Sequence, residues 1–204
     1  MVGTCSFSLY SSREFMKILL SLLGKMFYWS INWRFEPMPD YVSNKHVLIG
    51  FPHTSNMDTI RAFFGFKIIK RTGHIMIKKG WFVFPMSLFF KALGGIPVDR
   101  DAPQGTVGQM VQRFHERDEF LLAIVPEGTR KGVKTIKTGF WHIAKEANVS
   151  IICWYLDNDH KVTRWLGEVT PGEEKAEDVL KIQKIYAEAG YQFPLDIASL
   201  YKNS

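Results

Sequence analysis

Short apolar runs alternate with stretches of helical periodicity along most of the chain, and the runs are apolar almost throughout rather than at every second position. We expect buried strands at 46–51, 73–78, 95–98, 119–126 and 150–156. We expect helices at 57–69, 85–93, 104–117 and 138–147. This order predicts an α/β fold with a mixed, largely parallel central sheet flanked by helices.

The C-terminal part continues the pattern with a hairpin and a helix. The sequence DNDH at 157–160, followed by KVTRWLGEV, is typical of a strand that turns back on its neighbour. Residues 171–190 form a charged amphipathic segment, and its early acidic residues suit a helix N-terminus.

Residues 14–33 form a strongly apolar segment that Lys17, Lys25 and Asn32 interrupt, which argues against a spanning helix. Its wide apolar face and its tryptophans fit an amphipathic helix lying on a membrane surface, and packing on its own domain is the alternative. The two prolines of 36–40 should end it. We therefore divide the chain into a membrane-associating helical segment at 1–40 and an α/β domain at 41–204. Residues 1–12 lack the pattern of a secretory signal.

The formal charge of +6 favours an anionic partner: nucleic acid, acidic lipid headgroups or a phosphorylated substrate. No nucleic-acid-binding module is recognisable, so nucleic acid is not an expected partner. The two cysteines, Cys5 and Cys153, have no spacing that suggests zinc, and no metal site is predicted.

His53 and Asp58 stand five positions apart, a separation that puts them on different faces of a regular helix. They can meet only if His53 precedes the helix and Thr54 or Ser55 caps it. Asp58 in the first turn would then hold one imidazole nitrogen protonated and leave the other free to accept a proton. The alternative is structural, because Ser55-x-x-Asp58 also fits a capping box.

Two further polar clusters follow predicted strands. The turn at 125–140 carries Glu127 and the basic residues Arg130, Lys131, Lys134 and Lys137. Exposed backbone N–H groups and an arginine fork can cradle a phosphate, whereas a solvated basic loop needs no ligand. Asp99 and Arg100 follow LGGIPV, where a surface ion pair is the alternative. Because sites in such sheets gather beyond the strand ends, all three clusters are expected at one edge.

Taken together, the three clusters make the chain similar to the glycerolipid acyltransferase family, which includes lysophosphatidic acid acyltransferase. HTSNMD resembles the family's His-x4-Asp motif, GGIPVDR its second block and VPEGTR its Glu-Gly-Thr-Arg block, in the family's order. The resemblance covers about 46–156. Ser150 departs from it, since proline is common in the fourth block.

The resemblance implies a general base, His53, oriented by Asp58. It assigns acceptor-phosphate binding to Arg100, Glu127, Gly128, Thr129 and Arg130, with Lys137 adding charge. The implied reaction moves a fatty acyl group from acyl-CoA or acyl carrier protein to the free hydroxyl of a lysophospholipid, most simply 1-acylglycerol-3-phosphate, without an acyl-enzyme and without a cofactor. Such a protein would be peripheral or monotopic on the cytoplasmic face of a membrane.

Two alternatives to this function stay open. One is a non-catalytic lipid-binding or membrane-tethering protein of the same fold. The other is an acyltransferase that uses a lyso-aminolipid or another lysophospholipid. Residues 81–93 are aromatic on several sides, and we favour a core helix for them over a segment that lines an acyl groove or enters lipid.

Overall fold

A seven-stranded sheet forms the centre of the computed structural model, which describes residues 4–52, 55–99, 101–127, 136–193, 195 and 200, without the side chains of 4–11, 13 and 56. The strands are β1 (Arg34–Phe35), β2 (Lys45–Phe51), β3 (Gly73–Lys78), β4 (Gly95–Val98), β5 (Phe120–Ile124), β6 (Ile151–Asp157) and β7 (Val162–Val169). Their order across the sheet is β1-β7-β6-β2-β5-β3-β4.

Five neighbouring strands, from β6 across to β4, are all parallel. The hairpin partner β7 runs antiparallel to β6, and β1 pairs with β7 in parallel. The predicted α/β fold with a mixed, largely parallel sheet is confirmed.

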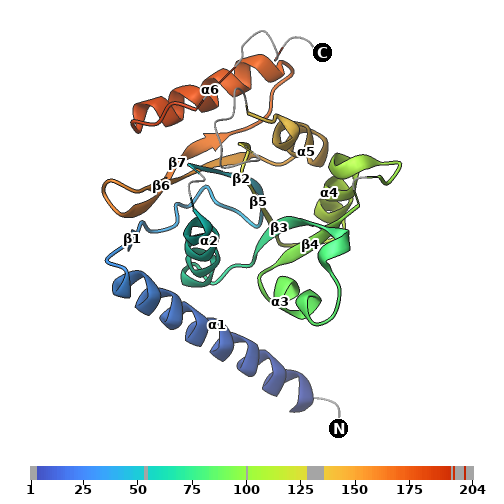
Figure 1. Cartoon of the computed structure of the whole chain (residues 1–204). Helices are drawn as coiled ribbons and strands as arrows, with labels where there is room; N and C mark the ends of the chain where they lie inside the picture. Colours follow the sequence, from blue (N-terminus) through green and yellow to red (C-terminus); the bar gives the residue numbers. More distant parts are fainter. Residues whose placement is uncertain are drawn as a thin grey trace.

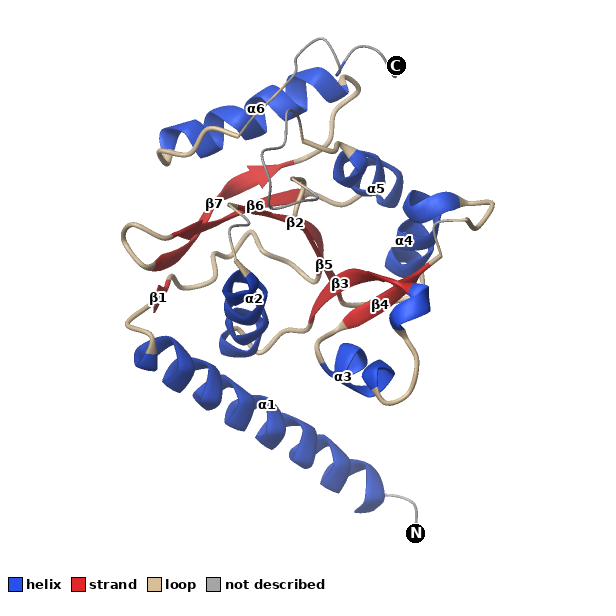
Figure 2. Cartoon of the chain, viewed as in Figure 1, coloured by secondary structure: helices blue, strands red, loops and turns tan. Residues whose placement is uncertain are grey.

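Helices cover both faces of the sheet (Figures 1 and 2). The helices are α1 (Thr4–Ser30), α2 (Asn56–Ile68), α3 (Met86–Ala92), α4 (Gly105–His115), α5 (Gly139–Ala147) and α6 (Lys175–Glu188), with a short 3-10 turn, η1 (Lys79–Trp81), before α3. In Figure 1, α1 and α2 lie below the sheet, α5 and α6 lie above it, and α3 lies at the lower right near β4.

Burial on both faces explains why the strands are apolar without alternation. In β2, Val47 and Ile49 pack in the core that includes α4, α5 and α6, whereas Leu48 packs in a second core with Phe66 of α2. Neighbouring side chains of a strand point to opposite faces, so each face needs its own apolar set. The period-two signal of a half-exposed strand is therefore missing here.

Helix α1 packs on the domain through its small and polar side. Gly24 is buried, the Ser21 hydroxyl donates to the Ile68 carbonyl at 3.0 Å, and the Tyr28 hydroxyl donates to the Arg61 carbonyl at 3.0 Å. The opposite side, which we call the outer face of α1, is apolar and exposed. It consists of Phe15, Met16, Ile18, Leu19, Leu22, Leu23, Met26 and Trp29.

In the described part of the chain, no helix is both long enough and apolar enough to span a membrane.

The prediction of a core helix at 81–93 is wrong. No residue of η1 or α3 is buried, and Phe84 between them is 83% exposed. Periodicity cannot distinguish a helix buried all round from one whose aromatic side chains face outward, because both are apolar on every side.

The expected strands and helices of the domain form within two residues of their predicted limits, apart from the last helix, which begins at Lys175 rather than at Pro171. Strand β1 was not foreseen, since two residues carry no pattern. It lies within the predicted segment 1–40 and pairs with β7. The division at residue 40 stays a prediction.

Candidate active site

The three predicted polar clusters follow strands that end at the same edge of the sheet. Strands β2, β4 and β5 belong to the parallel set and end at Phe51, Val98 and Ile124. Of the predicted site residues, His53, Arg100, Gly128, Thr129 and Arg130 lie outside the described residues. Asp58, Glu127 and Lys137 are described, and each is placed below.

Asp58 lies in the first turn of α2, and its side chain is 3% exposed. Its Oδ2 accepts the Ser55 backbone N–H at 2.7 Å, and Ser55, in extended conformation, is the N-cap of the helix. The carboxylate therefore satisfies one of the donors that a helix start leaves free. The capping role foreseen for Asp58 is confirmed, and it fixes the carboxylate at the helix entrance.

Arg61 is a neighbour of Asp58 that the sequence analysis missed. Its Nη1 donates to Asp58 Oδ1 at 2.9 Å and to Asn158 Oδ1 at 3.3 Å, and its guanidinium lies 3.9 Å from the centre of the Trp33 ring. Arg61 stands three residues after Asp58, a spacing that allows an ion pair on a helix. This spacing was the sequence signal from which the contact between Asp58 and Arg61 could have been predicted.

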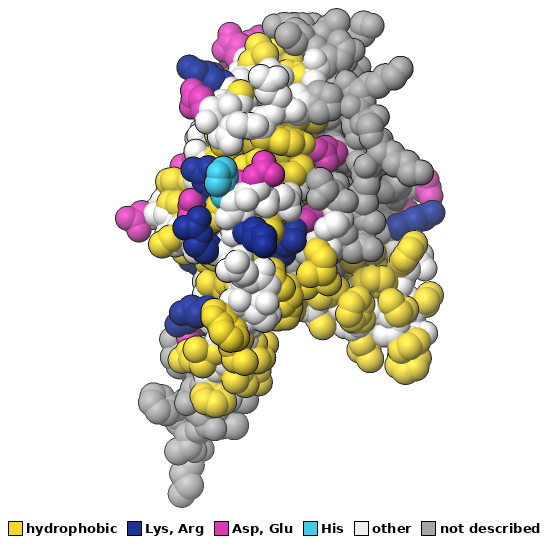
Figure 3. Space-filling view, turned by 60° about the vertical axis from the view of Figure 1, so that its left-hand side comes forward, with side chains coloured by type: hydrophobic (Ala, Val, Ile, Leu, Met, Phe, Trp, Pro, Cys, Tyr) yellow, Lys and Arg dark blue, Asp and Glu magenta, His cyan; other side chains and the backbone are white. Residues whose placement is uncertain are grey.

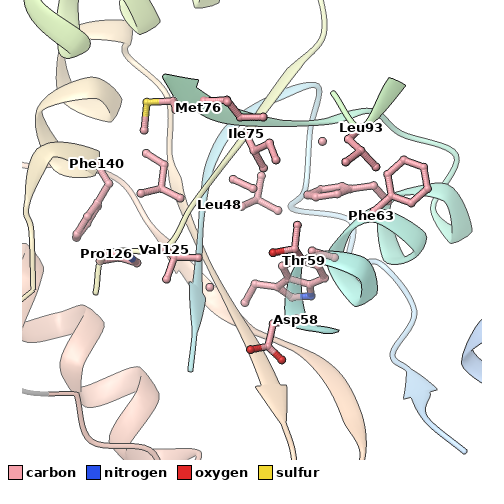
Figure 4. A pocket seen from close by; sticks show the side chains of 18 of the residues that line it. Leu48, Asp58, Thr59, Phe63, Ile75, Met76, Leu93, Val125, Pro126 and Phe140 are labelled. Carbon is pink, nitrogen blue, oxygen red and sulfur yellow. The ribbon is translucent and has the colours of Figure 1, made fainter. Parts of the chain in front are cut away.

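A cavity of about 670 Å³ opens beside Asp58. Most of its wall is apolar, with Leu48, Phe63, Ile75 and Phe140 among the side chains that Figure 4 labels. In that view Asp58 lies at one end of the cavity, below the apolar groups. Among the described residues, Asp58 is the one acid in the wall.

The charged groups around the cavity are mostly basic. Lys67, Lys78 and Lys137 line it, and the cavity wall has no other charged residue besides Asp58 in the described part of the chain. Burial lowers the pKa of Lys67. Lys137 is exposed, and its backbone N–H donates to the Pro126 carbonyl at 2.9 Å, which holds it next to the end of β5. The structure thus brings Asp58 and Lys137 to one cavity, 79 positions apart in the chain.

Glu127 follows Pro126, a residue of the cavity wall. Its Oε1 accepts a hydrogen bond of 2.5 Å from the hydroxyl of Tyr191, which lies beyond the end of α6. Burial, and then the adjacent Glu127 carboxylate, raise the pKa of Tyr191, so the phenol stays protonated and remains a donor. Sequence gave no signal for this contact, because the two residues lie 64 positions apart.

Within the described ranges, no group of three or more His, Cys, Asp or Glu side chains is arranged to hold a metal ion. The described part of the site places an oriented carboxylate beside an apolar cavity and several cations. A fixed carboxylate can orient an imidazole, and cations can hold phosphate groups. Apolar walls can bind a hydrocarbon chain.

The model of the acyltransferase family, described as "Acyltransferase", matches residues 35–156, which is more than half of the 204 residues. The chain belongs to the acyltransferase family. The matched span runs from β1 to β6 of this acyltransferase and contains every predicted site residue. The family membership and the enzyme class inferred from the three motifs are thereby confirmed.

The fold of the acyltransferase is similar to a solved one. The crystal structure of the 1-acyl-sn-glycerophosphate (LPA) acyltransferase, PlsC, from Thermotoga maritima superposes with a TM-score of 0.60 and 15% sequence identity, over 90% of this chain and 83% of that chain. At this identity the likeness concerns the fold. A comparison with curated proteins found no match.

Proposed function

We propose that this acyltransferase moves a fatty acyl group from acyl-CoA or acyl carrier protein to the free hydroxyl of a lysophospholipid, with 1-acylglycerol-3-phosphate as the leading acceptor. One observation carries the proposal: a buried carboxylate, Asp58, held by hydrogen bonds from Ser55 and Arg61, lies at the end of a large apolar cavity in a member of the family. An acyl chain suits the cavity walls, and the lysines around them suit phosphate groups.

In the proposed reaction, His53 accepts the proton of the acceptor hydroxyl while Asp58 holds the other side of the imidazole. The hydroxyl oxygen attacks the thioester carbonyl and forms a tetrahedral intermediate. Its collapse breaks the carbon–sulfur bond, forms the ester and releases the thiolate, which takes up the proton. A positioned base contributes about 10²- to 10⁴-fold, so binding and orientation of the two substrates supply much of the remaining acceleration.

The acceptor phosphate is assigned to Arg100, Glu127, Gly128, Thr129 and Arg130, with Lys137 adding positive charge. A carboxylate repels a phosphate, so Glu127 is not expected to contact the phosphate itself. We assign it the role of positioning the other residues of this group. Its hydrogen bond from Tyr191 supports that role, because the bond fixes the start of the turn that follows β5.

We further propose that the protein docks on a membrane surface through the outer face of α1. The exposure of this face supports docking, since seven aliphatic or aromatic side chains between Phe15 and Met26 are at least 40% exposed. A helix that packs on its domain through Ser21 and Gly24, and turns its apolar side to solvent, suits a lipid surface. The cytoplasmic face stays a prediction.

The Asp58→Asn variant tests the catalytic assignment. Asparagine keeps an oxygen for the Ser55 N–H but loses the charge that supports an imidazolium, so we expect kcat to fall by about 10²- to 10⁴-fold with the fold intact. Circular dichroism and a thermal melt check the fold. The matched control is Asp101→Asn, an exposed aspartate outside the cavity wall, which should keep full activity. Wild-type kcat in Asp58→Asn would exclude the assignment.

A further inference from the structure

The segment from η1 to α3 exposes a group of large apolar side chains. We call it the aromatic patch: Trp81, Val83, Phe84, Met86, Leu88 and Phe89. Trp81, Val83, Phe84 and Leu88 are each more than 60% exposed. Contiguous apolar surface of this kind is uncommon on soluble monomers and marks a site of interaction.

The charged residues next to the aromatic patch in the sequence are basic. Lys78, Lys79 and Lys91 flank it, and the sequence from Gly73 to Val98 contains no Asp or Glu. Lys79 forms an exposed ion pair with Asp99, at 3.2 Å, outside the patch. Lysine is depleted in protein–protein interfaces, whereas aromatic side chains flanked by lysines are typical of contacts with anionic lipid surfaces.

The aromatic patch and the outer face of α1 lie on the same side of the molecule. In Figure 1, α1 and α3 both lie along the lower side, opposite α6. Figure 3, turned about the vertical axis, shows hydrophobic side chains gathered at the lower left and lower right of the surface. Both groups therefore lie toward the lower part of the molecule, away from α6.

We infer that the aromatic patch is a second membrane contact, which inserts beside anionic headgroups while α1 lies on the same leaflet. Two contacts fix the tilt of a protein on a bilayer, which a single helix does not. The chain from the patch continues into Leu93, a residue of the cavity wall, so the patch joins the membrane to the site. The inference rests on the proposed function insofar as the acceptor is a membrane lipid.

Site-specific fluorescence tests the inference directly. In a Cys5→Ser background the remaining thiol, Cys153, is buried and burial raises its pKa to about 12, so it reacts slowly with a label. An environment-sensitive nitrobenzoxadiazole label is attached at Phe84→Cys. The matched control carries the label at Tyr41→Cys, an exposed aromatic position before β2 and outside both contacts.

With vesicles of phosphatidylcholine and phosphatidylglycerol, we expect the label at position 84 to shift to the blue and to be quenched by doxyl lipids. The label at position 41 should do neither. An unchanged label at position 84 on vesicle-bound protein overturns the inference, as does a failure of the protein to bind vesicles. A blue shift that depends on protein concentration without vesicles also overturns it and assigns the patch to a second copy of the chain.

A double variant, Trp81→Ser with Phe84→Ser, provides an independent measurement. Loss of two inserted aromatic rings should weaken binding to these vesicles by roughly tenfold or more. Acyl transfer to a detergent-dispersed acceptor should stay at the wild-type rate, because neither residue lines the cavity. Wild-type vesicle affinity in the double variant contradicts the inference, whereas absence of acyl transfer in the wild-type protein contradicts the proposed function instead.

Discussion

At the scale of single residues, the carboxylate of Asp58 has a structural role, to which the proposed function adds a chemical one. It accepts one hydrogen bond from the Ser55 N–H at the start of α2 and another from the Arg61 guanidinium one turn later. Both contacts restrict its rotation, so the carboxylate is oriented before substrate binds, and pre-organisation of this kind is worth more than charge alone. Arg61 is itself held between Trp33 and Asn158.

Arg61→Met tests whether Arg61 positions Asp58. Methionine keeps apolar contact with Trp33 but loses the charged hydrogen bond, whose usual worth corresponds to roughly 10- to 100-fold, so we expect kcat to fall by about that factor with both KM values unchanged. Arg61→Lys should recover part of the loss. The measurement is steady-state kinetics in both substrates. A rise in KM at constant kcat would instead place Arg61 in substrate binding.

The position of Asp58 was predictable in part, because this residue carries two local signals: its distance from His53 and its capping position after Ser55. The contact between Glu127 and Tyr191, and the packing of Arg61 on Trp33, were not predictable. Both contacts join residues far apart in the chain. No sequence pattern around Tyr191 or Trp33 indicates which residue each of them contacts.

At the scale of elements, most strands and helices followed from apolar patterning, because each strand is buried on two faces and each covering helix on one. The apolar patterning did not predict whether the apolar sides of α1 and α3 face the domain or the outside. Periodicity gives the apolar side of a helix, but not whether protein or another phase covers it. For α1 the small residues Ser21 and Gly24 determine the answer, since they let α2 approach closely.

Gly24→Leu tests this contact between α1 and α2. A Cβ at Gly24 would lie 2.9 Å from the Phe64 carbonyl oxygen and 3.0 Å from Ile68 Cγ1. We expect a loss of about 1–3 kcal/mol in the free energy of unfolding, because the helices must move apart. The matched control is Lys25→Leu, which puts the same side chain at an exposed position of the same helix. Equal stability of the two variants, measured by urea unfolding, would contradict the packing.

Strand β3 carries a second testable feature, His74. Burial, and then the adjacent Arg117, lower the pKa of His74 from 6.5 to about 4. The unfolded chain therefore binds a proton more readily than the folded protein between these values, and stability should fall as pH drops from about 6.5 to about 4. In His74→Gln, which cannot titrate, this part of the pH dependence should disappear. Urea midpoints across the range provide the measurement, and an unchanged slope would exclude His74 as its source.

At the scale of the whole molecule, the sheet order determines where chemistry can occur. Strand β2 lies between β5 and β6. The chain leaves β2 through α2 toward β3 on one side, and α5 later connects β5 to β6 on the other side. Ligands of open α/β sheets bind at such points, beyond the carboxyl ends of the strands. Hydrophobic side chains gather on the lower side of the molecule (Figure 3), and under the proposed function a lipid substrate would approach that edge from this side.

The most direct test of the central claim is mass spectrometry of the products formed from an isotope-labelled acyl donor and a panel of lysophospholipid and lyso-aminolipid acceptors, with donors presented as acyl-CoA and as acyl carrier protein. The wild-type protein should form a labelled diacyl product, with 1-acylglycerol-3-phosphate the best acceptor, and His53→Ala should form almost none while keeping its fold. Product formation by His53→Ala at the wild-type rate, or no labelled product from any acceptor with the wild-type protein, would contradict the account.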